Sequence, residues 1–351
     1  FDESTLSLDI QATSDDTFLK TYKMKSPLIT NTTTLTSSLG ISTYREDLSF
    51  DVDLKVYEDL NKKKNDRFEY VYPAYDLIKN FNNNNTKNGT FSFRSNGFVK
   101  NYNTNVFEKV IINDLIFNSN YKITNSGLKN NYNFLIKNVN TDADNSLEYK
   151  NTTDHKLATM AEYNSSYPLK KENSKYINKL KPMISLKFSP NNTKDIRNKN
   201  RRIDSNNVFM MNRISANDSV EGGASLTYGA EFSKNNKSDK EIFGAKIANI
   251  IRPEEDENLP KNNNFGDKTS DFIGALNYSP NDIVKLNYNF SLDSNLSEKN
   301  YEILSSEFRV NNFVTTFEYL NENDTIGSSS YLANKTMFNI DADKNLIFET
   351  R

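Results

Sequence analysis

The chain has 351 residues, with 44 basic and 46 acidic side chains and a net charge of −2. It lacks the basic excess of nucleic-acid-binding proteins, so no nucleic acid partner is expected. The absence of cysteine excludes disulfides and thiolate metal sites, and a single histidine excludes a histidine-rich metal site. The single histidine also excludes a histidine-based catalytic triad, and no glycine-rich phosphate loop or nucleophile elbow is present. We therefore expect no metal, no cofactor and no catalytic residue.

Hydrophobic residues make up only 36% of the chain, yet it contains 19 tyrosines and 23 phenylalanines. Such a composition fits neither a disordered chain nor a helical membrane protein. No run of about 18 apolar residues is present, so no membrane-spanning helix is expected. A transmembrane β-barrel remains open, because half of each of its strands is polar. The chain starts at Phe1 without a signal peptide, and we interpret it as part of a longer protein.

Alternation of apolar and polar residues predicts strands along the first half of the chain. Thr17–Tyr22 is a short strand-like run, and the clearest strand is Leu48–Val56, in which large aliphatic residues alternate with charged ones. Residues 67–78 form another strand that is interrupted at Pro73. Because proline cannot donate to a ladder, Pro73 predicts a strand end, an edge or a bulge.

The second half alternates more regularly. The run Val208–Arg213 leads into a short polar turn, Asn212–Gly223, which is followed by the strand Ala224–Phe232. In that strand the even-numbered residues are apolar and the odd-numbered ones polar. Val284–Leu292 repeats this pattern with apolar residues at its even positions. Each of these strands therefore has one face for an apolar environment and one for water.

The strand-like segments are about 9–12 residues long, which matches the roughly 9–11 residues of a tilted strand that crosses a bilayer. No helical period persists over three turns. The sequence therefore favours an all-β fold, an antiparallel transmembrane β-barrel of roughly 14–18 strands, incomplete in this chain. We expect residues 1–351 to form one partial barrel domain. A soluble sandwich or an extracellular adhesive protein is the alternative.

The polar turn and its flanks carry a family resemblance. They resemble the "NRFSG-DRVEGG…YG" segment of the LPS-assembly outer-membrane protein, the LptD family, especially its α-proteobacterial branch. Matches follow in the same order on both sides, and the residues that carry the resemblance are Phe188-Ser189-Pro190-Asn191, Asp204–Phe209, Asn212–Ser215, Asp218–Gly223, Tyr228-Gly229 and Leu276–Asp282. Two positions depart from the pattern, since Ser219 replaces an arginine and Ala216 a glycine. We expect the family's N-terminal periplasmic jelly-roll and closing C-terminal strands to lie outside this chain.

The resemblance implies that the protein is not an enzyme. It implies translocation of lipopolysaccharide to the outer leaflet of the Gram-negative outer membrane, with no covalent bond made or broken. The implied partners are lipopolysaccharide, a plug lipoprotein, periplasmic bridge proteins and outer-membrane lipid. A porin-like or substrate-specific outer-membrane channel is the first alternative, and a secreted β-rich adhesive or binding protein is the second.

Within this frame we expect a polar cluster of Asn212, Arg213, Asp218 and Glu221. We interpret Gly222 and Gly223 as a kink that lets the loop Asn191–Asn206 fold into the lumen. An ordinary hairpin turn is the alternative. The polar faces of the later strands should line the lumen, contacting lipopolysaccharide head groups or the plug, at Glu231, Lys285, Asn287 and Asn289.

Three loops complete the expectations. The acidic run Glu254–Glu257 is read as a solvated loop rather than a divalent-cation site, and Asp341–Lys344 as a turn rather than a calcium loop. Because extracellular loops are usually the longer ones, we expect Arg252–Ser270 to be extracellular and Pro280–Asp282 periplasmic.

Overall fold

The structure, a computed structural model, describes residues 3–22, 31–63, 66–81, 88–199, 201–214, 216–261, 264–324, 327–340 and 344–351. It divides into two compact units, which we describe separately. Unit 1 contains residues 1–120 and 134–159, and unit 2 contains residues 121–133 and 160–351.

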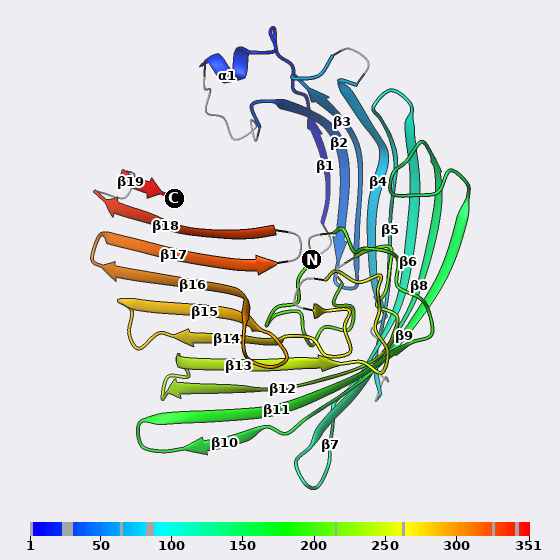
Figure 1. Ribbon diagram of the computed structural model, residues 1–351. Helices are drawn as coiled ribbons and strands as arrows, with labels where there is room; N and C mark the ends of the chain where they lie inside the picture. The colour runs from blue at the N-terminus through cyan, green and yellow to red at the C-terminus, as the bar shows by residue number, and fades with distance from the viewer. Residues whose placement is uncertain are drawn as a thin grey trace. The chain divides into compact units, whose positions relative to one another are not determined.

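The described residues form nineteen strands and one short helix (Figure 1). The strands pair antiparallel, as expected for the all-β fold. Roughly fourteen to eighteen strands were expected; two of the nineteen, β7 and β10, are only two and four residues long. The expected turn at residues 341–343 lies outside the described residues.

In chain order, the first elements are β1 (Glu3–Asp9), α1 (Phe18–Tyr22), β2 (Thr34–Arg45), β3 (Leu48–Asp59), β4 (Phe68–Phe81), β5 (Gly89–Tyr102), β6 (Val106–Ser119), β7 (Lys122–Ile123), β8 (Lys129–Asp144), β9 (Asp154–Ser166) and β10 (Leu169–Glu172). The later elements are β11 (Tyr176–Ser189), β12 (Gly223–Asn236), β13 (Glu241–Ile251), β14 (Phe272–Tyr278), β15 (Val284–Leu292), β16 (Lys299–Val310), β17 (Phe313–Asp324), β18 (Gly327–Asn339) and β19 (Asn345–Thr350).

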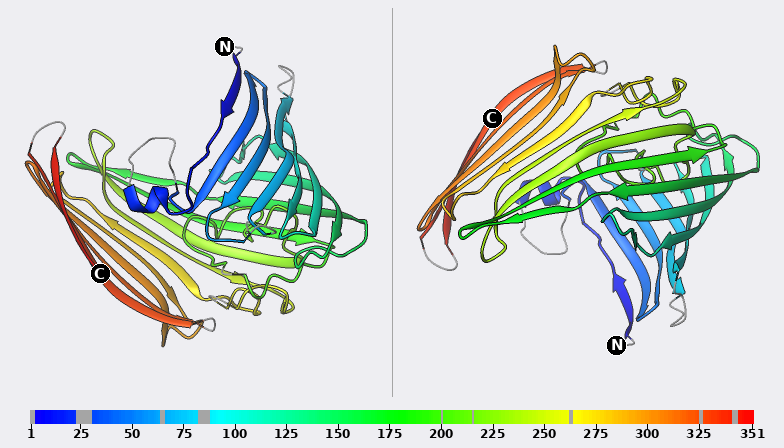
Figure 2. Two further views of the ribbon diagram at one scale, coloured as in Figure 1. Left: turned by 90° about the horizontal axis from the view of Figure 1, so that it is seen from above. Right: turned by 90° about the horizontal axis from the view of Figure 1, so that it is seen from below.

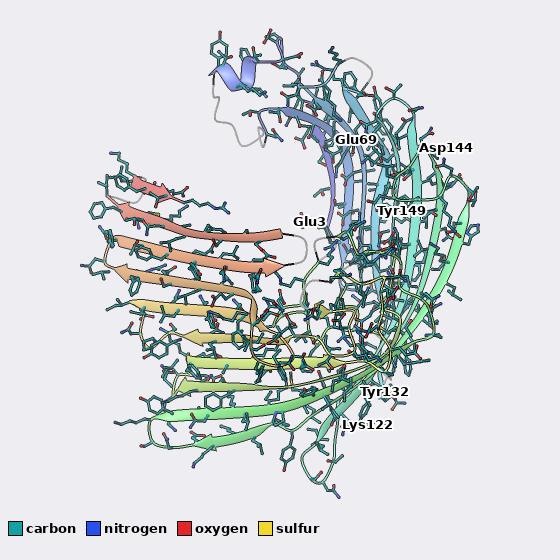
Figure 3. All side chains as sticks on the ribbon, viewed as in Figure 1. Glu3, Glu69, Lys122, Tyr132, Asp144 and Tyr149 are labelled. Carbon is teal, nitrogen blue, oxygen red and sulfur yellow. The ribbon has the colours of Figure 1, made fainter. Side chains whose placement is uncertain are left out.

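In unit 1, strands β1 to β6 pair in sequence order, each with the next. β4 continues through Pro73, where its register with β5 shifts between Val71 and Ala74. Of the three outcomes expected for this proline, the structure has the bulge. An apolar cluster of Val110, Ile112 and Val139 packs against Tyr149, which Figure 3 labels.

The prediction of a strand-like run at Thr17–Tyr22 is wrong, because Phe18–Tyr22 is the helix α1. Asp15 caps the start of α1. Its Oδ1 accepts hydrogen bonds from the Thr17 N–H at 2.7 Å and from the Thr17 hydroxyl at 2.5 Å. Such capping satisfies N–H groups that a helix leaves unpaired at its start. Leu19 then packs in a small cluster with Leu35 and Leu60.

In unit 2, strands β11 to β19 also pair in sequence order, and Figure 2 shows them running side by side. Short turns alternate with longer connections along β11 to β14. The two long loops, residues 190–222 and 252–271, join β11 to β12 and β13 to β14 at the same strand ends. The prediction of an alternating strand at Val208–Arg213 is wrong, because these residues lie inside the first long loop.

The sheet of unit 2 has two unlike faces. One face is covered by the two long loops, and we call it the loop face. The other carries exposed apolar side chains, and we call it the bare face; on it lie Leu180, Ile184, Leu186, Phe188, Ile247, Leu276 and Tyr278. Ser225 and Thr227 of β12 are buried on the loop face, as the alternation of this strand predicts.

Candidate functional site

The two long loops fold against the sheet of unit 2 through an apolar cluster of their own. Burying an aliphatic or aromatic side chain contributes about 1.5–3 kcal/mol, so a cluster of this size can hold irregular chain segments in place. Four of its members come from loop 190–222, two from loop 252–271 and three from β13 and β14; they are Ile196, Ile203, Val208, Ile214, Leu259, Phe265, Ala248, Ile250 and Ile273.

Arg213 directly precedes Ile214 of this cluster and is only 2% exposed. Its Nε donates to Glu221 Oε2 at 2.7 Å, and its Nη2 pairs with Glu221 Oε1. The same guanidinium donates to Thr227 Oγ1 at 2.8 Å and to Ser225 Oγ at 2.7 Å. Arg213 therefore anchors the loop to the polar residues of β12 while sharing a two-pronged ion pair with Glu221.

Arg252, the first residue after β13, reaches the same carboxylate. Its Nη2 donates to Glu221 Oε1 at 2.6 Å, and its Nε donates to the Phe265 carbonyl at 3.1 Å. The Phe265 ring lies 5.7 Å from the Arg213 guanidinium carbon and 5.1 Å from that of Arg252. One buried carboxylate thus joins the two long loops, with an aromatic ring beside both cations.

A second buried pair lies on the same face of β9 and β11. Lys187 and Glu162 stand opposite each other in the ladder, with their charged atoms 3.7 Å apart. Glu162 also accepts from Ser185 Oγ at 3.1 Å and from Asn133 Nδ2 at 2.7 Å. Lys187 donates to the Met210 carbonyl in loop 190–222. The loop is therefore fixed to β11 as well as to β12.

The charge of Glu221 makes stability depend on pH. Burial raises the pKa of this carboxyl, but the guanidinium groups of Arg213 and Arg252 outweigh burial and lower the pKa to about 2. A carboxyl with a lowered folded pKa stabilises the protein above its unfolded pKa of 4.5 and loses that contribution as the pH falls to about 2.

We expect this contribution to be of the order of 3 kcal/mol at neutral pH, because each pKa unit corresponds to about 1.4 kcal/mol. The measurement is the unfolding midpoint of the wild-type chain and of Glu221→Gln between pH 7 and pH 2. The gap between the two should close as the pH falls below 4.5. A gap that is independent of pH would contradict this assignment.

The glycine pair lies where the two ends of loop 190–222 meet. The Gly222 N–H donates to Thr193 Oγ1 at 2.8 Å, and a Cβ on Gly222 would collide with the Asn191 carbonyl. Gly223 has a φ of +73°, in the left-handed region that favours glycine. The Thr193 hydroxyl in turn donates to Asp256. We call the place where the two ends of loop 190–222 meet the crossing. Through Thr193 and Asp256 the crossing also connects the first long loop to the second.

The other two residues expected in the polar cluster lie in the same loop but make different contacts. Asp218 pairs with Lys194. Asn212 Nδ2 donates to the Ser219 carbonyl at 3.0 Å. Ser219 occupies the position of an arginine in the family pattern, and its Oγ accepts from the Lys194 N–H at 3.1 Å. These contacts hold the turn of the loop together, whereas Arg213 and Glu221 hold the loop to the sheet.

Glu231 lies further along β12 on the loop face. It pairs with Lys181 of β11 at 3.2 Å and with Lys246 of β13 at 3.0 Å. These three side chains line a pocket of about 360 Å³ whose wall includes residues 205 and 206 of the first long loop. Two of these three residues are lysines, so together their side chains carry a net positive charge.

The remaining expected residues lie on β15. Lys285 stands opposite Glu307 of β16, with 3.6 Å between their charged atoms. Asn289 accepts a hydrogen bond of 3.4 Å from Ser205 of the first long loop. Asn287 is in register with strand residues on both sides. The structure therefore does not bring these β15 residues into the Arg213 cluster, but Asn289 meets the first long loop through Ser205.

Sequence reasoning missed the buried ionic residues Arg252, Lys187 and Glu162. Arg252 stood at the start of an acidic, asparagine-rich loop, and nothing in its surroundings signalled burial. Lys187 and Glu162 sit on the polar sides of their strands, but only the ladder register brings them together. The fully buried Asp271 was missed in the same way.

Within the described part of the chain, no group of histidine, cysteine, aspartate or glutamate side chains is arranged to hold a metal ion. Among the same residues, no helix is long and apolar enough to cross a membrane.

A long antiparallel sheet with a bare apolar face and a polar face under folded loops defines the class of outer-membrane β-barrel proteins. The LptD family model, described as LPS transport system D, matches residues 2–345. The chain therefore belongs to the LptD family, whose members are outer-membrane proteins of lipopolysaccharide transport and assembly, and no enzyme activity is known for the family. No curated protein sequence matches the chain.

Proposed function

We propose that residues 1–351 form part of the wall of a lipopolysaccharide-translocating barrel, with the loop face of unit 2 turned to the lumen. The division of polar and apolar residues between the two faces supports this proposal. The bare face offers apolar side chains to lipid, while the loop face carries polar and charged side chains such as those of Asn287, Glu231 and Lys246. Lipopolysaccharide head groups, which are phosphorylated sugars, need such a polar surface.

In this proposal the two long loops are a fixed lining of the lumen. The observation that carries it is the buried Arg213–Glu221–Arg252 network, which joins both loops to β12. The pocket beside Glu231, with Lys181 and Lys246, would contact phosphate groups or an acidic surface of the plug lipoprotein. Periplasmic bridge proteins would deliver the lipid to the barrel.

Site-specific photo-crosslinking tests this proposal in cells. A photoreactive residue at Asn287, on the loop face, should form adducts with lipopolysaccharide only while new lipopolysaccharide is being made. The matched control is Leu286, its neighbour on the bare face of the same strand. At this position, adducts should form with membrane lipid whether or not synthesis continues.

The same experiment distinguishes transport from a porin-like channel. Absence of synthesis-dependent adducts at each of Lys285, Asn287 and Asn289, in variants that reach the outer membrane in folded form, would argue against lipopolysaccharide passage along this face.

A further inference from the structure

A groove of about 480 Å³ lies on the bare face of unit 2, opposite the residues described above. It follows two rows of residues that are paired across β11, β12 and β13. Its lining is almost entirely apolar and includes Ile184, Tyr228, Ala230, Ile247 and Phe272. The volume falls within the roughly 300–1,000 Å³ of sites that bind small molecules.

Apart from Tyr167 and Tyr228, the polar residues of the lining are Ser165, Ser166 and Asn249. Asn249, on β13, is completely buried. Its Nδ2 donates to the Ser270 carbonyl at 2.6 Å and to the Asp271 carbonyl at 3.3 Å. Because both partners are acceptors, they fix which end of the amide is nitrogen. Asn249 Oδ1 then accepts no hydrogen bond from any residue that the structure describes.

A buried amide oxygen without a donor is costly, so a ligand that supplies a donor gains affinity there. Asn249 lies two residues before the end of β13 at Ile251. Its row continues across the sheet through Tyr228 and Ile184, and exposed apolar side chains of the bare face, among them Leu186 and Phe188, lie beyond that row toward the same end. Asn249 therefore lies within the apolar band that faces acyl chains. The site therefore combines an apolar channel with a buried amide oxygen that the described residues leave without a donor.

We propose that this groove binds one acyl chain of a membrane lipid that carries a hydroxyl group beside the chain, and that the hydroxyl donates to Asn249 Oδ1. Family membership places the bare face in the outer membrane, so lipid is the molecule that this groove meets. A hydroxyl fits better than an ammonium group, because burying a charge in an apolar groove costs more than burying a neutral donor. The site is separate from the loop face and does not depend on lipopolysaccharide passing there.

Two matched lipids test the hydroxyl directly. The probe is a lysophosphatidylcholine, whose glycerol hydroxyl is its only hydrogen-bond donor. The control is the same lipid with that hydroxyl methylated. Native mass spectrometry of the full chain in detergent micelles should show about tenfold tighter binding of the hydroxyl lipid, which corresponds to about 1.4 kcal/mol. Equal binding of the two lipids would overturn the proposal.

Two variants locate the binding in the groove. Ala230→Phe fills the groove from β12 and should weaken lysolipid binding by about tenfold. Leu226→Phe lies on the same strand and face but outside the lining, and should bind as the wild type does. In Asn249→Leu the preference for the hydroxyl lipid should disappear.

Heat-modifiable gel migration confirms that each variant is folded before binding is compared. Wild-type binding by folded Ala230→Phe would show that the lipid sits elsewhere and would overturn the proposal. If Ala230→Phe does not fold, the comparison of the two lipids on the wild-type chain still decides the outcome. If no lipopolysaccharide crosslinks form at Asn287, the proposed function fails but the lipid-binding test still decides this proposal. The crosslinks probe the loop face, whereas the groove lies on the bare face.

Discussion

Replacing Glu221 with glutamine is expected to lower the free energy of unfolding by about 3–5 kcal/mol, the cost of breaking a buried ion pair by removing one partner. Glu221 is 3% exposed and is the carboxylate shared by Arg213 and Arg252. Glutamine keeps the size of the side chain but leaves two buried guanidinium groups without a counter-charge. The measurement is urea-induced unfolding in detergent micelles, followed by heat-modifiable gel migration.

The matched control is Glu231→Gln. Glu231 lies on the loop face of β12, the face against which the loop of Glu221 folds. It also pairs with two cations, but its side chain is 37% exposed. A solvent-accessible ion pair contributes about 0–1 kcal/mol, so this variant should stay close to the wild type. Glu221→Asp keeps the charge on a shorter side chain and should fall between the two. If both glutamine variants lose equal stability, burial of the ion pair is not the cause.

Gly222→Ala is expected to destabilise the protein by about 1–3 kcal/mol or more, as overpacking of a closed site does. The added Cβ meets backbone atoms, the Asn191 carbonyl and, at 2.9 Å, the Thr193 nitrogen. Neither can move without opening the crossing that joins the two ends of loop 190–222. Unfolding in urea and the yield of folded chain both measure the loss.

The neighbouring Gly223 provides the control. It has a positive φ, but a Cβ there would have no heavy atom within 4 Å. Gly223→Ala should therefore cost only the conformational penalty of about 1–2 kcal/mol, and Gly223→Asn less, because asparagine tolerates this region. An order in which Gly223→Ala is more damaging than Gly222→Ala would contradict the assignment of a close backbone approach at Gly222.

Alternation along the chain was sufficient to predict most of the strands and their faces. In β12 the even residues lie on the bare face and Ser225 and Thr227 on the loop face, as the period of two requires. The same rule failed for Val208–Arg213, where apolar residues pack into a loop core. Over so few residues, a buried irregular segment can imitate a strand.

The candidate site was only partly accessible from the sequence. Arg213 and Glu221 are eight residues apart in one loop, and the sequence was enough to place them in one cluster. Arg252 meets Glu221 across 31 positions, and Lys187 meets Glu162 only through the register of β9 with β11. Contacts of this kind depend on tertiary packing, which local patterns do not encode.

The length of loop 190–222 has a consequence for chain entropy. Strands β16 and β17 are joined through Asn311 and Asn312 alone, so bringing them together costs little conformational freedom. Pairing β11 with β12 closes a far longer segment, and each doubling of loop length adds about 0.6 kcal/mol to that cost. The apolar cluster and the buried ion pairs of the two loops offset this loss of entropy. They therefore help to hold β11 and β12 together, in addition to lining one face of the sheet.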